Sequence, residues 1–253
     1  MTPRYAITFD VDWAPDWAIA LCADMCRARG IPATFFSTNP SAVLDELRRD
    51  ELFEVGIHPN FLGASTHGAT WEEVMAFCLK MVPDARAMRS HDLFGCSSLF
   101  SLIISSFGQI KTDSSLFLPG TQSCDPTILY HGTPVGALVR VPFSFADNIA
   151  ARSPGWRWER EPQLSRGSTV VNFHPSLVAL NYDRPGAYQK LKTALGGRPL
   201  ERASRDDFAP YVNTGAGART YLKHLLECLA PADCATISAF AAAHAGGRAS
   251  PQD

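Results

Sequence analysis

Three apolar segments of this chain end in side chains that can bind a cation or move a proton. Asp10 and Asp12 close the first segment, His58 follows the second, and His174 follows the third. Neighbouring carboxylates repel each other unless a cation lies between them or one of them stays protonated. Histidine binds divalent metals and also serves as a general acid or base near neutral pH. The pattern therefore predicts a metal-dependent hydrolase with its site at the ends of buried strands.

Residues suited to a metal centre follow the first two of these segments. Asp10 and Asp12 stand two positions apart, so in a strand their side chains would share one face. His67 lies nine residues after His58, in the loop that leaves the same segment. Imidazoles combined with a carboxylate suit Zn²⁺ or related late divalent ions such as Co²⁺ and Ni²⁺. The sequence thus favours a divalent metal cofactor, with Zn²⁺ as the first choice.

Other polar residues near strand ends could complete a catalytic site. Arg89 closes a fourth apolar segment and could hold a carboxylate in a bidentate grip that keeps it ionised. His91 could be a metal ligand, a substrate contact or neither. Asn172 and His174 share one face of their strand, where a histidine is a natural general acid or base. Trp156 could stack on a sugar ring, but packing against other apolar side chains explains it equally well.

Composition limits the class of protein. The chain has 253 residues, of which 46% are hydrophobic and 19% charged, with a formal net charge of −2. This length can bury one large core, and the absence of a basic stripe argues against a nucleic-acid partner. No apolar run is long enough for a membrane helix, and no signal peptide is recognisable. Together with seven cysteines, an odd number that favours reduced thiols, these features predict a cytoplasmic protein.

Strand-like and helix-like segments alternate along the chain, which favours a parallel sheet in a single α/β domain. Residues 113–135 and 144–168 are expected to be long loops, and 246–253 a disordered tail. The expected strands are Tyr5–Asp10, Ala33–Ser37, Phe53–Ile57, Ala85–Arg89, Gly108–Lys111, Leu138–Pro142, Thr169–Phe173 and Cys234–Ser238. The expected helices are Pro15–Arg29, Ser41–Arg49, Trp71–Met81, Tyr221–Leu229 and Ala239–His244.

Several different short motifs follow one another along the chain in a characteristic order. They are Thr8-Phe9-Asp10-Val11-Asp12, Ala33-Thr34-Phe35-Phe36, Gly56-Ile57-His58, Arg89, Phe173-His174-Pro175 and Ala235-Thr236-Ile237-Ser238. This ordered set resembles the polysaccharide deacetylase family, the NodB-homology carbohydrate esterases. The first motif differs from the family's Thr-Phe-Asp-Asp by one residue inserted between the acids.

The resemblance implies a fold and an activity. The expected fold is a distorted (β/α)₇ TIM-like barrel that forms one domain over residues 1–245. The expected activity is metal-dependent hydrolysis of the acetamide of an N-acetylated sugar. The branch that the chain is most similar to is encoded with bacterial surface-polysaccharide genes, which implies a role in O-antigen-like (lipopolysaccharide) metabolism.

The resemblance also implies roles for individual residues. Asp147 is similar in position to the acidic residue of the family's fourth motif and is expected to contact substrate. It further implies that Asp10 is the general base and that Arg89 orients it. Asp12 and His58 are expected to be metal ligands, and His174 the general acid.

One family ligand is missing from this sequence. The second motif of the family is His-x-x-x-His, and its second position is here Leu62, which cannot bind a metal. We expect His67 to replace it, with His91 or Asn60 as alternative ligands. Asn60, His91 and Trp156 are otherwise expected to contact the sugar.

Alternative functions fit parts of the same pattern. A related enzyme on this fold could hydrolyse a different C–N bond. A haloacid dehalogenase-type phosphatase would use Asp10 and Asp12 with Mg²⁺, but that family expects Gly-Thr where Trp13-Ala14 stands here. A non-catalytic sugar-binding or scaffold protein is favoured by Leu62 and opposed by the retained acid–base residues. The sequence gives no indication of the oligomeric state.

Overall fold

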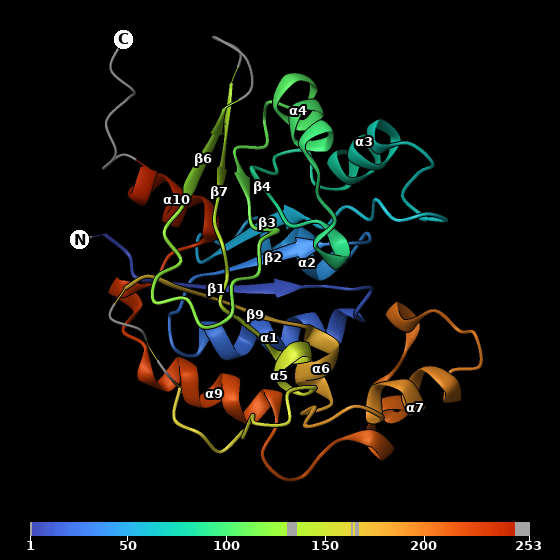
Figure 1. The fold of residues 1–253 in the computed structure, drawn as a ribbon. Helices are drawn as coiled ribbons and strands as arrows, with labels where there is room; N and C mark the ends of the chain where they lie inside the picture. Colours follow the sequence, from blue (N-terminus) through green and yellow to red (C-terminus); the bar gives the residue numbers. More distant parts are fainter. Residues whose placement is uncertain (1, 131–135, 163, 165–166, 246–253) are drawn as a thin grey trace.

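The computed structural model describes residues 2–130, 136–162, 164 and 167–245 (Figure 1), so the tail expected at 246–253 lies outside the described residues. The strands are β1 (Tyr5–Asp10), β2 (Ala33–Ser37), β3 (Phe53–Ile57), β4 (Ala87–Met88), β5 (Thr112–Asp113), β6 (Thr127–Tyr130), β7 (Ala137–Arg140), β8 (Phe145–Ala146) and β9 (Thr169–Phe173). The α-helices are α1 (Asp16–Arg27), α2 (Ala42–Leu47), α3 (Trp71–Met81), α4 (Ser97–Ser106), α5 (Asp147–Ala150), α6 (Pro175–Ala179), α7 (Ala187–Ala194), α8 (Arg205–Phe208), α9 (Ala218–Cys228) and α10 (Ile237–Ala245).

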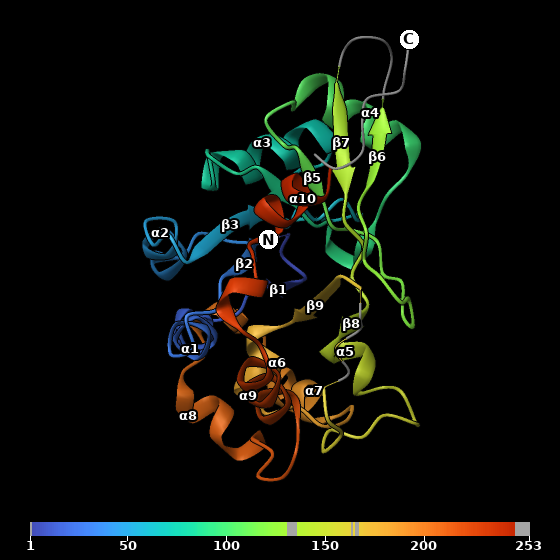
Figure 2. The ribbon, with the colours of Figure 1, turned by 90° about the vertical axis from the view of Figure 1, so that its left-hand side faces the viewer.

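The strands form one curled sheet. Its order is β6-β7-β5-β4-β3-β2-β1-β9-β8, and only the β6–β7 pair is antiparallel. Figure 2 shows the strands arranged around α10, which contacts β1, β5 and β7. The sheet is thus a barrel left open between β6 and β8. The expectation of a distorted α/β barrel is confirmed, with nine strands in place of the expected seven-fold repeat.

Side-chain alternation along the strands separates two regions of the core. On β1, Ile7 and Phe9 point outward and pack with α1 and its neighbours in the large core, where Phe9 stacks on Phe35 at 4.6 Å between ring centroids. Ala6 points inward and packs with Phe240 of α10 inside the barrel. Because successive residues of a strand face opposite sides, the polar Thr8 and Asp10 must also face inward. The buried interior of the barrel therefore carries the polar side chains.

A glycine allows the sheet to close tightly beneath these polar side chains. Gly56 of β3 faces the barrel interior, and a Cβ atom there would lie 2.6 Å from the Ala87 carbonyl oxygen and 2.9 Å from the Phe36 ring. Contacts this short do not occur without a shift of the backbone or the ring. Gly56 thus leaves room for Phe36, whose ring supports the catalytic region described below.

Most expected elements agree with the structure, and the differences have physical causes. Strands β1, β2, β3 and β9 and helix α3, with its Thr70–Glu73 capping box, occupy the predicted residues. Helix α4 and strand β6 were not expected, and β4 and β5 are shorter or displaced. The expected strand at 234–238 reduces to one bridge between Tyr5 and Cys234, because α10 already begins at Ile237.

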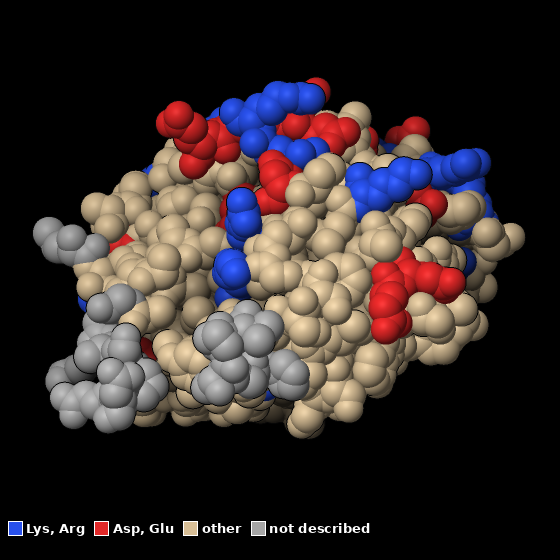
Figure 3. Space-filling view, turned by 90° about the horizontal axis from the view of Figure 1, so that it is seen from above, with Lys and Arg blue, Asp and Glu red and all other residues tan. Residues whose placement is uncertain are grey.

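Charges of both signs are mixed on one face of the molecule. Figure 3 shows Lys and Arg interspersed with Asp and Glu on the face seen from above Figure 1, rather than a basic patch. Within the described part of the chain, no helix is long and apolar enough to cross a membrane.

Candidate active site

The carboxyl ends of the parallel strands meet at one edge of the sheet and surround a cavity of about 170 Å³. Strand pairing explains why distant residues meet there: Thr8 of β1 is in register with Asn172 of β9, so Asp10 and His174 follow as neighbours. The end of an open parallel sheet is the usual place for a ligand in α/β proteins. The polar residues that line this cavity are Asp10, Asp12, His58, Ser90, His91, Asp92, Asn148, Asn172 and His174.

Arg89 is the fully buried cation of this region. It follows β4, and its guanidinium lies between two aromatic rings, 4.7 Å from the Phe36 centroid and 4.3 Å from the Phe143 centroid. Its Nη1 donates to Asp10 Oδ1 at 2.9 Å. Such a pair is stable in a core only when hydrogen bonds satisfy the remaining donors and acceptors. Arg89 therefore needs further partners.

Those partners come from three other parts of the sheet. Nη1 of Arg89 also donates to Thr8 Oγ1 and to Asn172 Oδ1, at 2.9 and 2.6 Å. Its Nε and Nη2 donate to the backbone oxygen and hydroxyl of Ser114, at 2.9 and 2.8 Å. Asn172 Nδ2 donates to the second oxygen of Asp10 at 2.8 Å. The Asp10 carboxylate is thus held at both oxygens beside the cavity, as its expected role requires.

A tight turn brings Asp12 back to the same cavity. Strand β1 ends at Asp10, and Asp12 and Trp13 both adopt the left-handed region, with φ of 46° and 55°. This conformation costs energy for residues other than glycine. The Trp13 N–H compensates by donating to Thr38 Oγ1 at 2.8 Å. Asp10 and Asp12 therefore meet through a turn rather than through simple strand alternation, which was the expected reason.

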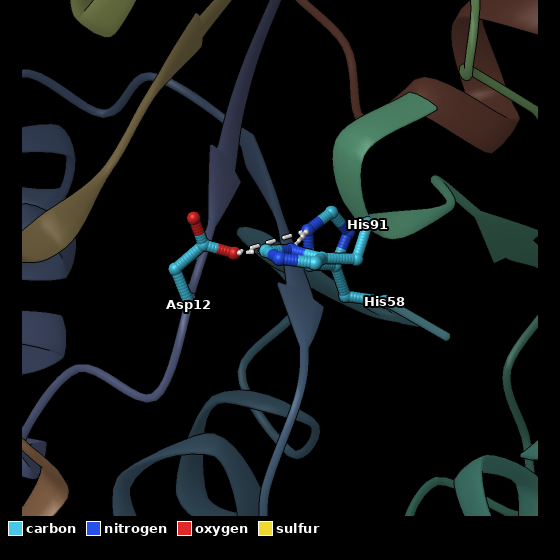
Figure 4. Close-up of side chains that lie close together, drawn as sticks. All are labelled: Asp12, His58 and His91. Carbon is cyan, nitrogen blue, oxygen red and sulfur yellow. Dashed lines mark hydrogen bonds and ion pairs between the residues drawn. The ribbon is translucent and has the colours of Figure 1, made fainter. Parts of the chain in front are cut away.

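Asp12, His58 and His91 converge on one point (Figure 4). Asp12 Oδ1 lies 3.2 Å from His58 Nε2 and 3.1 Å from His91 Nδ1, and the two histidine nitrogens are 3.3 Å apart. Burial alone raises the pKa of Asp12, but hydrogen bonds with both histidines and the charge of His174 outweigh burial and lower it. These three side chains could hold a divalent cation.

Neighbouring groups orient both histidines toward that point. His58 Nδ1 donates to the Arg89 backbone oxygen at 2.6 Å, and this bond turns Nε2 toward Asp12. His91 begins a short 3₁₀ turn, and the Trp13 ring packs against its imidazole at 5.2 Å between centroids. A hydrogen bond to the second nitrogen of a histidine is a usual feature of metal ligands.

His67 does not join this cluster, contrary to the expectation that it replaces the missing ligand at Leu62. Its Nε2 donates to the Thr38 backbone oxygen at 2.8 Å, and its Nδ1 accepts from the Asn60 N–H at 3.1 Å. Its ring also stacks on Phe77 at 4.9 Å. Both nitrogens are occupied by the backbone, so His67 ties two loops together. His91, one of the alternatives, takes the place near Asp12.

Two expected substrate contacts also lie elsewhere, because neither lines the cavity at the strand ends. The side-chain oxygen of Asn60 accepts from the Leu62 N–H at 3.1 Å and so stabilises its own loop. Trp156 packs against Phe145 and Tyr221, each with ring centroids 5.3 Å away. Trp156 is therefore a packing residue rather than a sugar-stacking one.

His174 and Asp147 form a second buried pair. Asp147 Oδ1 lies 2.5 Å from His174 Nδ1, and Asp147 Oδ2 accepts the His174 backbone N–H at 2.9 Å. Asp147 thus positions His174 rather than contacting substrate directly. Burial alone lowers the pKa of His174, but the charge and hydrogen bond of Asp147 outweigh it and raise that pKa to about 9. The free His174 Nε2 lies 3.6 Å from Asp12 and 4.0 Å from Asp10.

The comparisons with known proteins identify the family of this chain. Residues 7–192 match the family model of WbmS-like polysaccharide deacetylases. Because the match covers most of the chain, this protein belongs to the polysaccharide deacetylase family. A search of curated proteins found no significant match.

One solved structure shares the fold over most of both chains. A Bordetella bronchiseptica protein, WbmS, assigned to polysaccharide deacetylases involved in O-antigen biosynthesis, is 29% identical, with a TM-score of 0.75 over 89% of this chain and 90% of that one. One more distant match is a Bacillus anthracis CE4 family pseudoenzyme, with 12% identity and a TM-score of 0.39 over 77% of this chain and 60% of that one. Another is a cobalt-containing family 4 acetyl xylan esterase of Clostridium thermocellum (16% identity, TM-score 0.35, 78% and 80%).

Removing the buried cation should destabilise the protein. We expect Arg89→Met to lower the free energy of unfolding by about 3–5 kcal/mol, because the Asp10 carboxylate is left buried without its partner. Urea denaturation followed by circular dichroism measures this loss. Arg27→Met, which breaks two surface ion pairs with Asp24 and Asp50, should cost about 1 kcal/mol or less.

The double variant Arg89→Met/Asp10→Asn separates charge from packing. It should be more stable than Arg89→Met alone, since no unpaired charge stays in the core. A double variant that is no more stable than the single one would contradict the assignment of Arg89 as the counter-ion of Asp10.

Proposed function

We propose that this protein is a metal-dependent deacetylase that hydrolyses the acetamide of an N-acetylated sugar. The observation that carries the proposal is the convergence of Asp12, His58 and His91, with ligand atoms 3.1–3.3 Å apart. Ligand atoms about 2.0–2.1 Å from a tetrahedral zinc ion are about 3.3 Å from one another. The donor set and its spacing therefore fit Zn²⁺, with Co²⁺ or Ni²⁺ as chemically similar alternatives.

The remaining polar residues fit the two proton transfers of amide hydrolysis. When bound, the cation would lower the pKa of a water molecule and polarise the acetamide carbonyl group. Asp10 lies beside the ligand cluster and is the base that accepts the proton of the attacking water. Arg89 and Asn172 hold its two oxygens, so the carboxylate keeps its orientation. General-base help of this kind is worth about 10²–10⁴-fold in rate.

His174 supplies a proton to the departing amine. An amide nitrogen leaves poorly as an anion, so a proton donor is needed at the nitrogen. Asp147 fixes His174 through Nδ1 and keeps the imidazolium form stable, which leaves Nε2 free to donate into the cavity. Base and acid thus face the same cavity from neighbouring strands, with 4.0 Å between His174 Nε2 and the nearer oxygen of Asp10.

The cavity also offers a place for the acetyl methyl group. Phe117, Phe143 and Ala146 form an apolar part of its lining, while the acid–base residues form the polar part. A two-sided lining of this kind suits a group that is polar at the carbonyl and apolar at the methyl. The likeness to WbmS, whose description names O-antigen biosynthesis, supports a surface polysaccharide or its precursor as the substrate.

Metal content tests the ligand assignment. We expect about one equivalent of zinc or a similar ion in the purified protein, measured by elemental analysis, and its loss in His58→Ala and His91→Ala. His67→Gln should retain the metal, because both nitrogens of His67 bond to the backbone. Retention by His91→Ala together with loss in His67→Gln would overturn the assignment.

A surface group provides a further control for that measurement. Glu161, His224 and Cys228 also lie close enough to share a cation, but this group is largely exposed. His224→Ala should leave the metal content unchanged. Metal that disappears in His224→Ala and persists in His58→Ala would place the bound ion on the surface instead.

Substitution of the base tests catalysis separately from metal binding. We expect Asp10→Asn to reduce acetate release from N-acetylated saccharides at least about 10²-fold, because the water loses its proton acceptor. The variant should keep its metal, since Asp10 is not a ligand. Acetate release by the wild type is followed with a coupled assay over a panel of N-acetylated sugars.

The control for that assay is Asp24→Asn, which changes an exposed carboxylate far from the cavity lining and should retain full activity. If the protein is a non-catalytic binding protein, the wild type and Asp10→Asn should both bind metal or sugar and neither should release acetate. Unchanged activity in Asp10→Asn would remove Asp10 from the mechanism.

A further inference from the structure

A second cavity, of about 140 Å³, adjoins the acid His174. It shares Asp12, Asn148 and His174 with the cavity that accommodates the acetyl group in the proposed function. Its other walls come from α6, α7 and the residues after α5, which are grouped beside β9 in Figure 1. The two cavities therefore adjoin at the residue that protonates the sugar nitrogen in the proposed function.

This second cavity contains polar atoms without a partner. Ser176, which is 3% exposed, and Asn148 both line it. The buried oxygens Ser176 Oγ and Asn148 Oδ1 make no hydrogen bond within the described residues. A buried polar atom without a partner costs free energy, and a ligand at this place would supply the missing bond. Ser176 Oγ can donate to an acceptor on a ligand, whereas Asn148 Oδ1 can only accept and would need a donor such as a sugar hydroxyl group.

The charge of the lining indicates which polar group this is. Arg152 contributes a cation to the cavity and has no ion pair in the described part of the chain. Asp12 is the only carboxylate among the described residues of the lining, and its two oxygens face His58, His91 and His174. Tyr188 separates this cavity from a neighbouring one that contains Lys192. Among the described residues of this lining, Arg152 is therefore the cation that no carboxylate pairs with, whereas His174 is paired with Asp147.

We propose that Arg152, with Ser176, forms a subsite for an anionic substituent of the sugar, a carboxylate or a phosphate. This inference rests on the proposed function, because a sugar whose nitrogen meets His174 and whose acetyl group fills the first cavity must extend into the second. A guanidinium pairs with carboxylate and phosphate alike through parallel hydrogen bonds. The preferred substrate is then an acetamido sugar that carries a negative charge, rather than neutral N-acetylglucosamine.

The test measures the binding of amino sugars, which are the products of the proposed reaction. They have no acetyl group left, so they bind without being hydrolysed. Calorimetry compares glucosaminuronate, glucosamine phosphate and neutral glucosamine on the purified protein. We expect at least one anionic sugar to bind about tenfold more tightly than glucosamine, the usual gain from a charged hydrogen bond. Arg152→Gln should remove this preference, whereas Arg157→Gln, an exposed arginine outside both cavities, should retain it.

The anionic sugars distinguish the two sources of charge. Tighter binding of the uronate alone assigns the subsite to a carboxylate, and tighter binding of the phosphate alone assigns it to a phosphate. Equal binding of all three sugars, or a preference that survives in Arg152→Gln, overturns the proposal. The binding test needs no turnover, so it is independent of the activity assay. Preferred binding of an anionic sugar by a protein that releases no acetate would refute the deacetylase function and leave the subsite in place.

Discussion

The buried contact between Arg89 and Asp10 is the interaction on which the rest of the site depends. A guanidinium without access to water is stable only if every donor is used, and here the partners come from β1, β9 and the segment after β5. The same residue fixes His58 through its backbone oxygen. Arg89 therefore holds the proposed base through its side chain and orients a proposed metal ligand through its backbone oxygen, so the geometry of both depends on a single residue.

The strand ends were predictable because two simple rules apply there. Parallel strands bring their carboxyl ends to one edge, and alternation sends every second residue into the barrel. These rules were enough to place Asp10, His58 and His174 around one cavity, with Arg89 bonded to Asp10 behind it. The role of Asn172 was within reach as well, since its shared face with His174 was visible, but its bonds to Arg89 and Asp10 depend on the register of β1 and β9.

The loops were harder to predict because their conformations depend on tertiary contacts. His67 and His91 were both possible ligands, and sequence spacing favoured His67. The left-handed turn at Asp12 and Trp13 and the 3₁₀ turn at His91 decide between them, and neither has a clear sequence signal. Trp156 was misjudged for a similar reason: a polar stretch of sequence surrounds it, but the aromatic side chains that cover it come from distant segments.

The central claim is that Asp12, His58 and His91 form a metal centre beside a fixed base and acid. Anomalous diffraction from crystals grown with zinc tests it most directly. The account predicts a zinc peak about 2.0–2.2 Å from the Asp12 carboxylate, His58 Nε2 and His91 Nδ1. A peak bound by His67, or zinc found only at the surface group of Glu161, His224 and Cys228, would contradict it.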